Sequence, residues 1–595
     1  MAFVLVLLLL AIAGEAANAT PLDDYVNAGP DFVKYEMLPE ADLKGTSKHG
    51  PTKGMSWTAK AVNLTSQAWM TEDEWGADWG GEDAHWWHYM MVITPDTIAK
   101  GREGWNGMYV TGGKNTAAAP GRHSEDIMSI TELAMSTGMT WTVLFQVPNF
   151  PIYLRNPDGT TTGNLGEDAM LSYTFVRYMD FMKSGGDPQD AAGADWAVLL
   201  PMTKSVFAAM AASEEVCGFL PKDGAKMEWV VTGASKRGWT TWLAGAVDMA
   251  RPEKDRRIRS IAPIVLDGLS FDDMLHMHWG AYGGWSFTMS SFIEAGFTAR
   301  LDDKETEDLW KLVDPVYYVE RFKGLPKLVA DSTGDEWFLP DDSKHWIAAM
   351  QENGPVSLAM IPDADHSMVT GLPALIPTIG SFALSSLQQR AWPQFTWDMD
   401  LSMGSVTLTI DPEFADLKRT VQLWQSHTNR ADSPRRDFRL VNMDQKYLGE
   451  CKGGIASSDG QHCLNTRTGF WNNATLVADV ALDASGLVYS ASVQVPPRAA
   501  QEWVAFFVEV TFHDVSPDVV GSGQLGGEGA AADDATYCSG GRDQRFTPRD
   551  GGRRHCIPRT NNGDAMLATQ VGIVPDYLPF QCYGKDCEGS VDAMV

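Results

Sequence analysis

The sequence is short of basic residues. Lys and Arg number 47 against 77 Asp and Glu, so the 595-residue chain carries a formal net charge of −30. Binding to nucleic acid needs Lys and Arg concentrated against phosphates, and the basic runs around Arg256 and Arg435 are short. We therefore expect no nucleic-acid partner, and interpret the two basic runs as solvated faces or internal ion pairs.

Long apolar runs are missing too, except at residues 3–13, FVLVLLLLAIA. A bilayer span needs about 20 apolar residues, and residues 17–19, Ala-Asn-Ala, match a signal-peptidase site. No Lys or Arg precedes the run, and an uncleaved signal anchor is the alternative. We predict a signal peptide over residues 1–19, a secreted, extracellular chain and no stable membrane insertion after cleavage. Two N-glycosylation sequons, at Asn63 and Asn473, are compatible with secretion.

Cysteine is scarce, and six of the seven cysteines lie late in the chain. Their spacing lacks the paired CxxC pattern of a zinc site, and export favours disulfides. Six cysteines can pair in about 15 ways, so the connectivity stays open. Cys217 is left over, and we expect it to be a buried free thiol in a helix. Local pairing would join the six as follows: Cys451 with Cys463, Cys538 with Cys556, and Cys582 with Cys587.

Cofactor and metal fingerprints are missing as well. The sequence has no Walker motif and no convincing G-x-G-x-x-G after a strand, so we expect no cofactor. The close histidine pairs His85 and His88, and His276 and His278, have no Cys or carboxylate at a metal-binding spacing. We interpret them as packing residues and expect no metal site.

What is present, up to about residue 395, is an alternation of strands and helices. Short apolar runs between helical segments indicate a mainly parallel sheet covered on both faces. The expected strands are 108–111, 141–147, 227–232, 258–266, 326–330 and 356–361. The expected helices are 125–137, 194–212, 236–249, 341–352 and 373–388.

After about residue 395 strands dominate. We predict strands at 405–410, 420–425, 476–482, 488–495, 503–512 and 566–573. This pattern indicates a second, all-β sandwich-like domain over residues 396–582, following a first domain over residues 20–395. A Gly- and Asp-rich insertion lies at about 517–563, the late cysteines make the C-terminal part disulfide-rich, and residues 583–595 form a tail.

The sharpest local motif follows strand 227–232. Gly233, Ser235 and Gly238 form a tight turn into a helix, which is the layout of a nucleophile elbow. The turn would project the serine oxygen above the sheet, and the helix N-terminus favours developing negative charge. The spacing differs from G-x-S-x-G, because Gly238 comes one residue late and Arg237 takes its place. We predict Ser235 as a catalytic nucleophile.

An acid and a histidine follow in the order found in α/β-hydrolases, which is Ser, acid, His. Asp335 comes after strand 326–330 and His366 after strand 356–361. His366 would take and return the Ser235 proton, and Asp335 would orient the imidazole. Four other acids compete with Asp335 for this role: Asp267, Asp331, Asp341 and Asp342.

An oxyanion hole needs two backbone N–H groups near the nucleophile. We predict one from Lys236, directly after Ser235, and one from Gly113, in the Gly112-Gly113 pair after the strand at 108–111. The side chains of Lys236 and Arg237 would either bind an acidic substrate group or form internal salt bridges.

These motifs make the chain similar to the PhoPQ-activated pathogenicity-related protein family, which includes a secreted autocrine proliferation repressor. The resemblance covers most of residues 20–515 and resumes near 565, but the insertion does not match the family pattern. It implies an α/β-hydrolase-like domain followed by a β domain, and leaves the substrate open. The matching stretches are 20–25 (TPLDDY), 66–69 (SQAW), 147–149 (VPN), 199–204 (LLPMTK), 231–239 (VTGASKRGW), 334–335 (GD), 338–341 (FLPD), 363–366 (DADH) and 436–439 (RDFR).

Three functional hypotheses follow. The first is a secreted serine hydrolase, of esterase or peptidase type, that acts on an ester or peptide through Ser235, His366 and Asp335. The second is a secreted signalling or binding protein that uses the same scaffold to engage a cell-surface receptor without required catalysis. The third, a carbohydrate-binding or carbohydrate-esterase protein, depends only on the 22 tryptophans and the β region.

Overall fold

The computed structural model describes most of the chain. The described residues are 19–48, 51–70, 74, 85–189, 191–218, 226–428, 435–444, 455–456, 463–466, 471–476, 486–520, 536–538, 556–558 and 562–580. No helix within these ranges is long and apolar enough to cross a membrane. The predicted signal peptide, except its last residue, and the predicted tail lie outside them.

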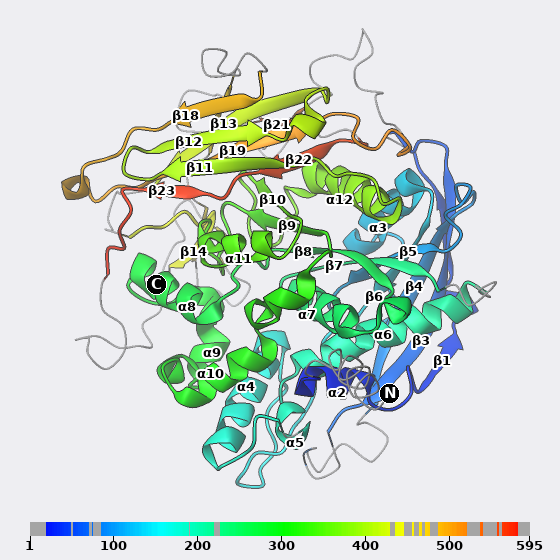
Figure 1. The fold of residues 1–595 in the computed structure, drawn as a ribbon. Helices are drawn as coiled ribbons and strands as arrows, with labels where there is room; N and C mark the ends of the chain where they lie inside the picture. Colours follow the sequence, from blue (N-terminus) through cyan, green and yellow to red (C-terminus); the bar gives the residue numbers. More distant parts are fainter. Residues whose placement is uncertain are drawn as a thin grey trace, which may run out of the picture.

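A large twisted sheet organises the described part of the molecule (Figure 1). Its main path runs β1-β3-β4-β6-β5-β7-β8-β9-β10 and then continues into C-terminal strands. The strands from β6 to β10 along this path pair in parallel, whereas β3 and β4 are antiparallel to their neighbours. The strand bounds are β1 Lys34–Met37, β2 Leu43–Thr46, β3 Ser56–Ala68, β4 His85–Pro95, β5 Trp105–Val110, β6 Thr140–Leu144, β7 Glu228–Ala234, β8 Ile258–Ile264, β9 Lys327–Ser332 and β10 Val356–Ile361.

Helices cover both faces of this sheet. On one face α6 (Leu199–Val216) and α7 (Lys236–Ala250) bury Val206 and Trp242 in one hydrophobic core. On the other face α3 (Glu125–Thr137) and α12 (Leu372–Leu387) bury Leu133 and Phe382 in a second core. Because helices cover both faces of the sheet, β6, β9 and β10 are buried at every position. The predicted mainly parallel sheet with helices on both faces is confirmed.

A group of helices forms a cap beyond the carboxyl ends of the strands. The first, α4 (Glu167–Lys183), follows β6, and three more follow β8: α8 (Phe271–Tyr282), α9 (Ser290–Glu294) and α10 (Lys304–Val313). They contact one another, and in Figure 1 α4, α9 and α10 lie below α7, with α8 to its left. The remaining α-helices are α2 Pro21–Asn27, α5 Ala191–Ala194 and α11 Ile347–Glu352.

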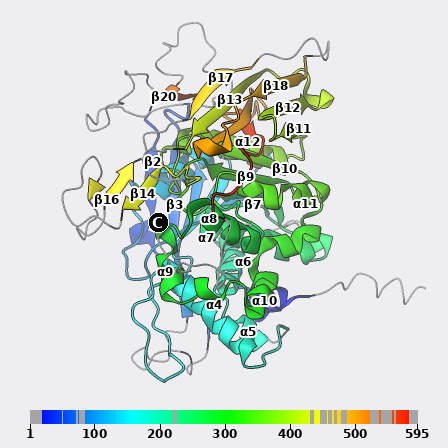
Figure 2. The same cartoon turned by 90° about the vertical axis from the view of Figure 1, so that its left-hand side faces the viewer.

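The C-terminal strands continue the main sheet. β22 (Ala565–Ala568) pairs with β10 through Leu358 and Ala568, and covers an edge that would otherwise be open. Beyond it follow β19 (Val504–Phe512), β13 (Arg419–His427) and β17 (Asn472–Thr475), with β23 (Gly572–Val574) on β19. Two views place these strands beside β11, β12 and β18 (Figure 2).

The prediction of a separate sandwich domain therefore needs correction. A small sheet of β11 (Phe395–Asp400), β12 (Ser405–Ile410) and β18 (Val488–Ser492) does face β13 and β19, as in a sandwich. However, the second layer belongs to the main sheet, and Leu408 and Val508 share one core with α3 and α12. In the described residues, the boundary near residue 395 does not separate two cores.

The cysteine predictions stay largely open. Cys451, Cys582 and Cys587 lie outside the described residues. Cys463 lies in β16 (Cys463–Thr466), which pairs with β14 (Val441–Asp444) and β15 (Ile455–Ala456). β20 (Thr536–Cys538) and β21 (Cys556–Pro558) belong to the predicted insertion and pair with each other.

The structure also places Cys217 and the two N-glycosylation sequons. Cys217 is free but exposed, because it comes just after the last residue of α6, so the prediction of a buried thiol is wrong. Of the two sequons, Asn473 is exposed in β17, whereas Asn63 is half-buried in β3 between β1 and β4. Glycosylation of either stays a prediction.

Candidate active site

Ser235 lies in the turn between β7 and α7, with φ 60° and ψ −130°. This is a strained conformation for a residue with a side chain. Glycines make the turn possible: a Cβ on Gly233 would lie 2.9 Å from the Val110 carbonyl oxygen, and one on Gly238 2.9 Å from that of Ile264. The late glycine thus allows the first turn of α7 to pack directly against β8, and the departure from G-x-S-x-G is accommodated.

The structure brings Ser235, His366 and Asp335 together. The Ser235 Oγ lies 2.8 Å from His366 Nε2, and His366 Nδ1 lies 2.8 Å from Asp335 Oδ2. The Asp335 carboxylate also accepts the backbone N–H groups of Trp337 at 2.7 Å and Phe338 at 3.1 Å. A serine in a tight strand-to-helix turn, a histidine and an acid are thus hydrogen-bonded in series, which is the geometry expected from the order of these residues in the chain.

The four rival acids have other environments. Asp341 forms a buried bidentate ion pair with Arg436, at 3.0 and 3.1 Å. Burial, and then the neighbouring Asp331, raise the pKa of Asp267 well above its usual range. Burial also raises the pKa of Asp331 to about 7 and that of Asp342 well above its usual range. Of the five acids, Asp335 is the one whose carboxylate oxygens are hydrogen-bonded to His366, at 3.0 and 2.8 Å from Nδ1.

Electrostatics around His366 favour its protonated form. Burial lowers the pKa of His366, but the charge of Asp335 and its hydrogen bond outweigh burial, so the pKa lies above the usual 6.5. Sequence analysis missed Glu336, whose Oε2 accepts the backbone N–H of His366 at 3.0 Å. Burial raises the pKa of Glu336 to about 8. The signal available in the sequence was its place directly after Asp335.

The two predicted oxyanion residues lie at adjoining loops. Lys236 is the first residue of α7, where backbone N–H groups have no partner within the helix. The loop after β5 carries Gly113, with φ 126°. A Cβ on Gly112 would lie 2.7 Å from Glu167 Oε1, the partner of Arg237, so this loop packs against the start of α7.

Internal ion pairs hold the side chains of Lys236 and Arg237. Lys236 Nζ lies 3.1 Å from Glu167 Oε2 and 2.9 Å from Asp168 Oδ1, and Arg237 pairs with Glu167 and donates to the Val147 carbonyl. Burial would raise the pKa of Glu167, but Arg237 and Lys236 lower it to about 2. Of the two interpretations left open by the sequence, the structure therefore supports internal salt bridges.

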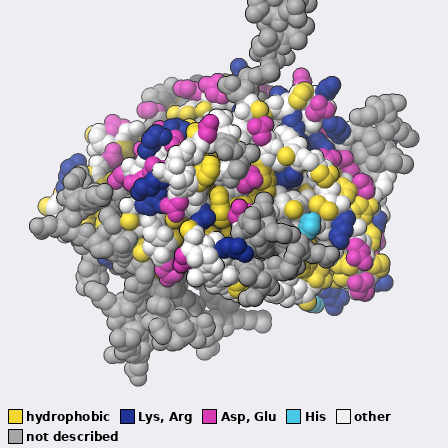
Figure 3. Space-filling model, turned by 90° about the horizontal axis from the view of Figure 1, so that it is seen from below, with side chains coloured by type: hydrophobic (Ala, Val, Ile, Leu, Met, Phe, Trp, Pro, Cys, Tyr) yellow, Lys and Arg dark blue, Asp and Glu magenta, His cyan; other side chains and the backbone are white. Residues whose placement is uncertain are grey.

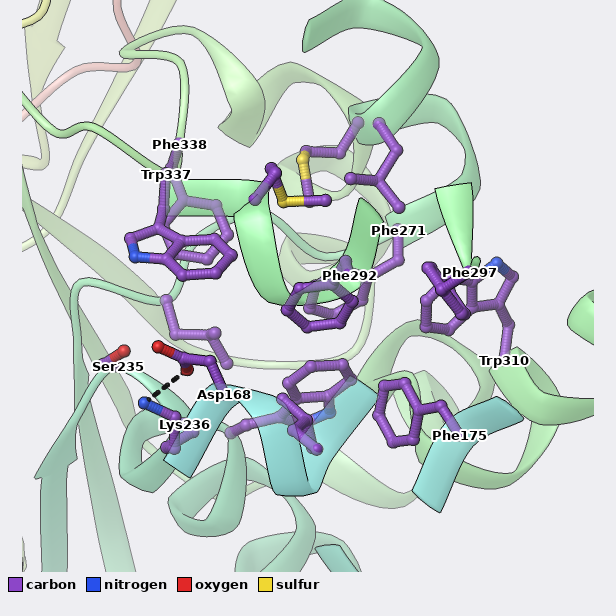
Figure 4. A pocket seen from close by; sticks show the side chains of 16 residues that line it. Asp168, Phe175, Ser235, Lys236, Phe271, Phe292, Phe297, Trp310, Trp337 and Phe338 are labelled. Carbon is purple, nitrogen blue, oxygen red and sulfur yellow. Dashed lines mark ion pairs between the residues drawn. The ribbon is translucent and has the colours of Figure 1, made fainter. Parts of the chain in front are cut away.

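A cavity opens beside Ser235 (Figure 4). It contains about 590 Å³ of empty space, counting its open mouth, and Ser235 and Lys236 line one end. The rest of its wall comes mainly from the cap helices and from Trp337 and Phe338. On the face seen in Figure 3, hydrophobic side chains lie among charged ones.

One histidine of each pair is buried, whereas His85 is exposed and His276 is half-buried with its Nε2 3.0 Å from Asp302 Oδ1. His88 is buried against Ser66 and the Phe145 carbonyl, and burial lowers its pKa to about 4. His278 is buried beside Tyr282, and burial lowers its pKa to about 3. Within the ranges that the structure describes, no group of three or more His, Cys, Asp or Glu could hold a metal ion.

Comparison with known proteins identifies a family for this chain. A family model described as PhoPQ-activated pathogenicity-related protein matches residues 31–439. Autocrine proliferation repressor protein A of Dictyostelium discoideum is 30% identical over 521 residues, which are 86% of this chain and 90% of that protein.

Solved structures similar to this chain include esterases and a peptidase. An acetyl xylan esterase from Paenibacillus sp. R4 is 15% identical, covers 59% of this chain and 90% of its own, and has a TM-score of 0.32. Acetyl xylan esterase 1 from Thermoanaerobacterium sp. is 15% identical, with 62% and 93% covered and a TM-score of 0.33. The acylaminoacyl peptidase of Pyrococcus horikoshii is 12% identical, with 57% and 49% covered and a TM-score of 0.32.

Proposed function

Because this chain belongs to the PhoPQ-activated pathogenicity-related protein family, whose name states no reaction, we propose its function from the site: a secreted serine hydrolase of esterase or peptidase type. The observation that carries the proposal is the unbroken hydrogen-bonded chain from Ser235 Oγ through both ring nitrogens of His366 to Asp335. Such a chain lets a neutral imidazole take the serine proton while the carboxylate stabilises the imidazolium.

The proposed mechanism follows from this chain. Ser235 Oγ attacks the substrate carbonyl as His366 Nε2 accepts its proton, and the backbone N–H groups of Lys236 and Gly113 stabilise the oxyanion. His366 then donates the proton to the leaving group, which departs and leaves an acyl-enzyme. Water, deprotonated by His366, attacks the acyl-enzyme and releases the acid and Ser235.

Secretion is the second part of the proposal. It is supported by the apolar run at residues 3–13 with its small-residue cleavage motif, and by the late cysteines. The exposed Asn473 on β17 supplies an accessible glycan acceptor.

The test uses protein purified from the medium of expressing cells and a fluorophosphonate probe. Wild type should be labelled, and Ser235→Ala should lose labelling and lower ester hydrolysis by roughly 10⁴–10⁶-fold, because the nucleophile is gone. Ser402→Ala, at an exposed serine between β11 and β12, is the matched control and should behave like wild type. Absence of labelling in folded wild type would contradict the hydrolase, and absence of protein from the medium would contradict secretion.

The name of the Dictyostelium relative favours one alternative, a secreted signalling or binding protein that engages a cell-surface receptor. Here Ser235 would be dispensable. If folded Ser235→Ala retains receptor binding and the cell response in full, the biological role does not require catalysis.

A further inference from the structure

The cavity beside Ser235 is apolar almost throughout. Of its 16 lining residues only Ser235, Lys236 and Asp168 are polar or charged, and all three lie at the end nearest the nucleophile (Figure 4). Sites of this kind bind a ligand through apolar contacts and a few well-placed polar groups. The residues that line the cavity therefore indicate which kind of substrate group it can bind.

The far end of the cavity is a preformed aromatic wall. Phe175 on α4, Trp310 on α10 and Phe297 between α9 and α10 pack against one another with ring centroids 5.8 to 6.2 Å apart. Phe271 stacks between Trp310, at 5.3 Å, and Trp239, at 4.1 Å. These side chains are buried and interlocked, so they present fixed aromatic faces and edges to an occupant.

The wall continues to the reacting atoms. Trp337 and Phe338 follow Asp335 in the chain, and their ring centroids lie 6.2 and 6.0 Å from that of His366. A group bound in the cavity would therefore be attached close to the bond that Ser235 attacks.

The polar end offers no uncompensated charge. Lys236 Nζ lies 2.9 Å from Asp168 and 3.1 Å from Glu167, so its charge is already neutralised by carboxylates. An ionised substrate group entering here would lose its hydration and find no free partner of opposite sign in the described lining.

We infer that this cavity binds an uncharged aromatic or bulky aliphatic group of the substrate, directly beside the scissile ester or amide bond. The inference rests on the proposed hydrolase function and narrows it to substrates with such a group. This group belongs either to the acyl part or to the leaving group of the substrate. In both cases it would make the same apolar contacts with the aromatic wall.

Two ester series on wild-type protein test the inference and distinguish the two sides. In the first series 4-nitrophenol is the common leaving group, and the acyl group is acetyl, butyryl, 3-phenylpropionyl or monosuccinyl. In the second, acetate is the common acyl group, and the alcohol is ethanol, 1-butanol or 3-phenyl-1-propanol, which leave with similar intrinsic reactivity. Burying one methylene group strengthens binding about four-fold. In one of the two series kcat/KM should therefore be at least about 10-fold higher for the ester with an aromatic group than for the smallest ester. The kcat/KM of the charged monosuccinyl ester should be lower than that of the butyryl ester. Equal kcat/KM values across both series, or preference for the charged ester, would overturn the inference.

A matched pair of variants connects the preference to the cavity. Met274→Trp, on α8, places a large ring inside the cavity and should bring the arene-to-acetyl ratio close to one. Met128→Trp makes the same change at an exposed site on α3 and should leave the ratio unaltered. A Met274→Trp protein that folds and keeps the full preference would contradict the assignment.

A binding experiment separates this inference from the hydrolase proposal. Ser235→Ala is titrated with methyl 3-phenylpropionate and with methyl acetate, and tryptophan fluorescence is followed, since Trp239, Trp310 and Trp337 line the cavity. Saturable quenching by the phenyl ester alone supports the cavity assignment, even if wild type hydrolyses nothing and the hydrolase proposal fails. No quenching, with hydrolysis intact in wild type, removes the cavity assignment and leaves the hydrolase.

Discussion

At the scale of single residues, the structure separates acids that the sequence could not. Five aspartates follow the right strands, but only Asp335 has oxygens hydrogen-bonded to His366. Burial raises the pKa of Asp267 and Asp331, and Arg436 holds Asp341. Chain order limits the choice to the ends of a few strands, whereas pairing and burial depend on neighbours that are distant in sequence.

The pH profile of the Asp335→Asn variant tests the role of this residue. Activity requires neutral His366, so it is lost as pH falls through the pKa of His366, which Asp335 holds above 6.5. Without that charge, burial dominates and lowers this pKa. The rising limb of kcat/KM against pH should therefore move to lower pH, and kcat should fall by about 10⁴-fold because the imidazole loses its correct tautomer.

The control for this profile is Asp365→Asn, the same change beside His366 at a residue that bonds only within its own turn. The rising limb of kcat/KM against pH for Asp365→Asn should coincide with that of wild type. If Asp335→Asn also keeps the wild-type limb, then Asp335 does not set the pKa of His366.

At the scale of elements, the sequence predicted the buried centre of the sheet better than its surroundings. The strands β6, β9 and β10 are buried at every position because helices cover both their faces. No helix was predicted over α4, although Leu171, Phe175, Tyr178 and Met182 repeat at helical spacing. No helix was predicted over α8, α9 or α10 either, so the cap over the cavity was missed, and with it the aromatic wall.

The antiparallel pair β20 and β21 allows a prediction about disulfide pairing. Its antiparallel register places Cys538 opposite Cys556. Cα atoms of such opposed residues lie roughly 4.5–5.5 Å apart, which is within the range that a disulfide bridges. Non-reduced peptide mapping of the secreted protein should therefore recover a peptide that links these two cysteines.

Cys217 is the internal control for this mapping, because it is free and exposed and should be alkylated before any reduction. Recovery of Cys538 or Cys556 as an alkylated thiol, or linked to another cysteine, would refute the pairing.

At the scale of the whole molecule, the C-terminal part supports the proposed active site. Leu440 N–H donates to the Gly334 carbonyl at 2.9 Å, and Trp471 N–H donates to Asp363 at 3.0 Å, so the loops that bear Asp335 and His366 are both held by residues beyond 395. The change in sequence pattern near residue 395 shows where strands replace helices. The pattern contains no information that β22, some 200 residues after β10, pairs with β10. For that reason the strands were predictable and the shared sheet was not.

Gly334→Ala, made in the full chain, tests whether the position of Asp335 depends on contacts with the C-terminal part. A Cβ on Gly334 would lie 2.6 Å from the Leu440 Cβ, 3.0 Å from the Leu440 nitrogen and 2.9 Å from the Ala364 carbonyl oxygen. Backbone atoms cannot give way as a flexible side chain could, so the loop bearing Asp335 must shift. A displacement of about 1 Å costs roughly 100-fold in rate, and the melting temperature should fall as well.

The matched control is Gly163→Ala, because a Cβ there meets nothing within 4 Å. It should keep wild-type hydrolysis and melting temperature. Both variants are measured by ester hydrolysis and thermal unfolding at equal concentration. If Gly334→Ala matches Gly163→Ala in both, then the contact between residues 435–440 and the acid loop does not hold Asp335 in place. In that case the C-terminal part would be attached to the hydrolase unit without supporting its site.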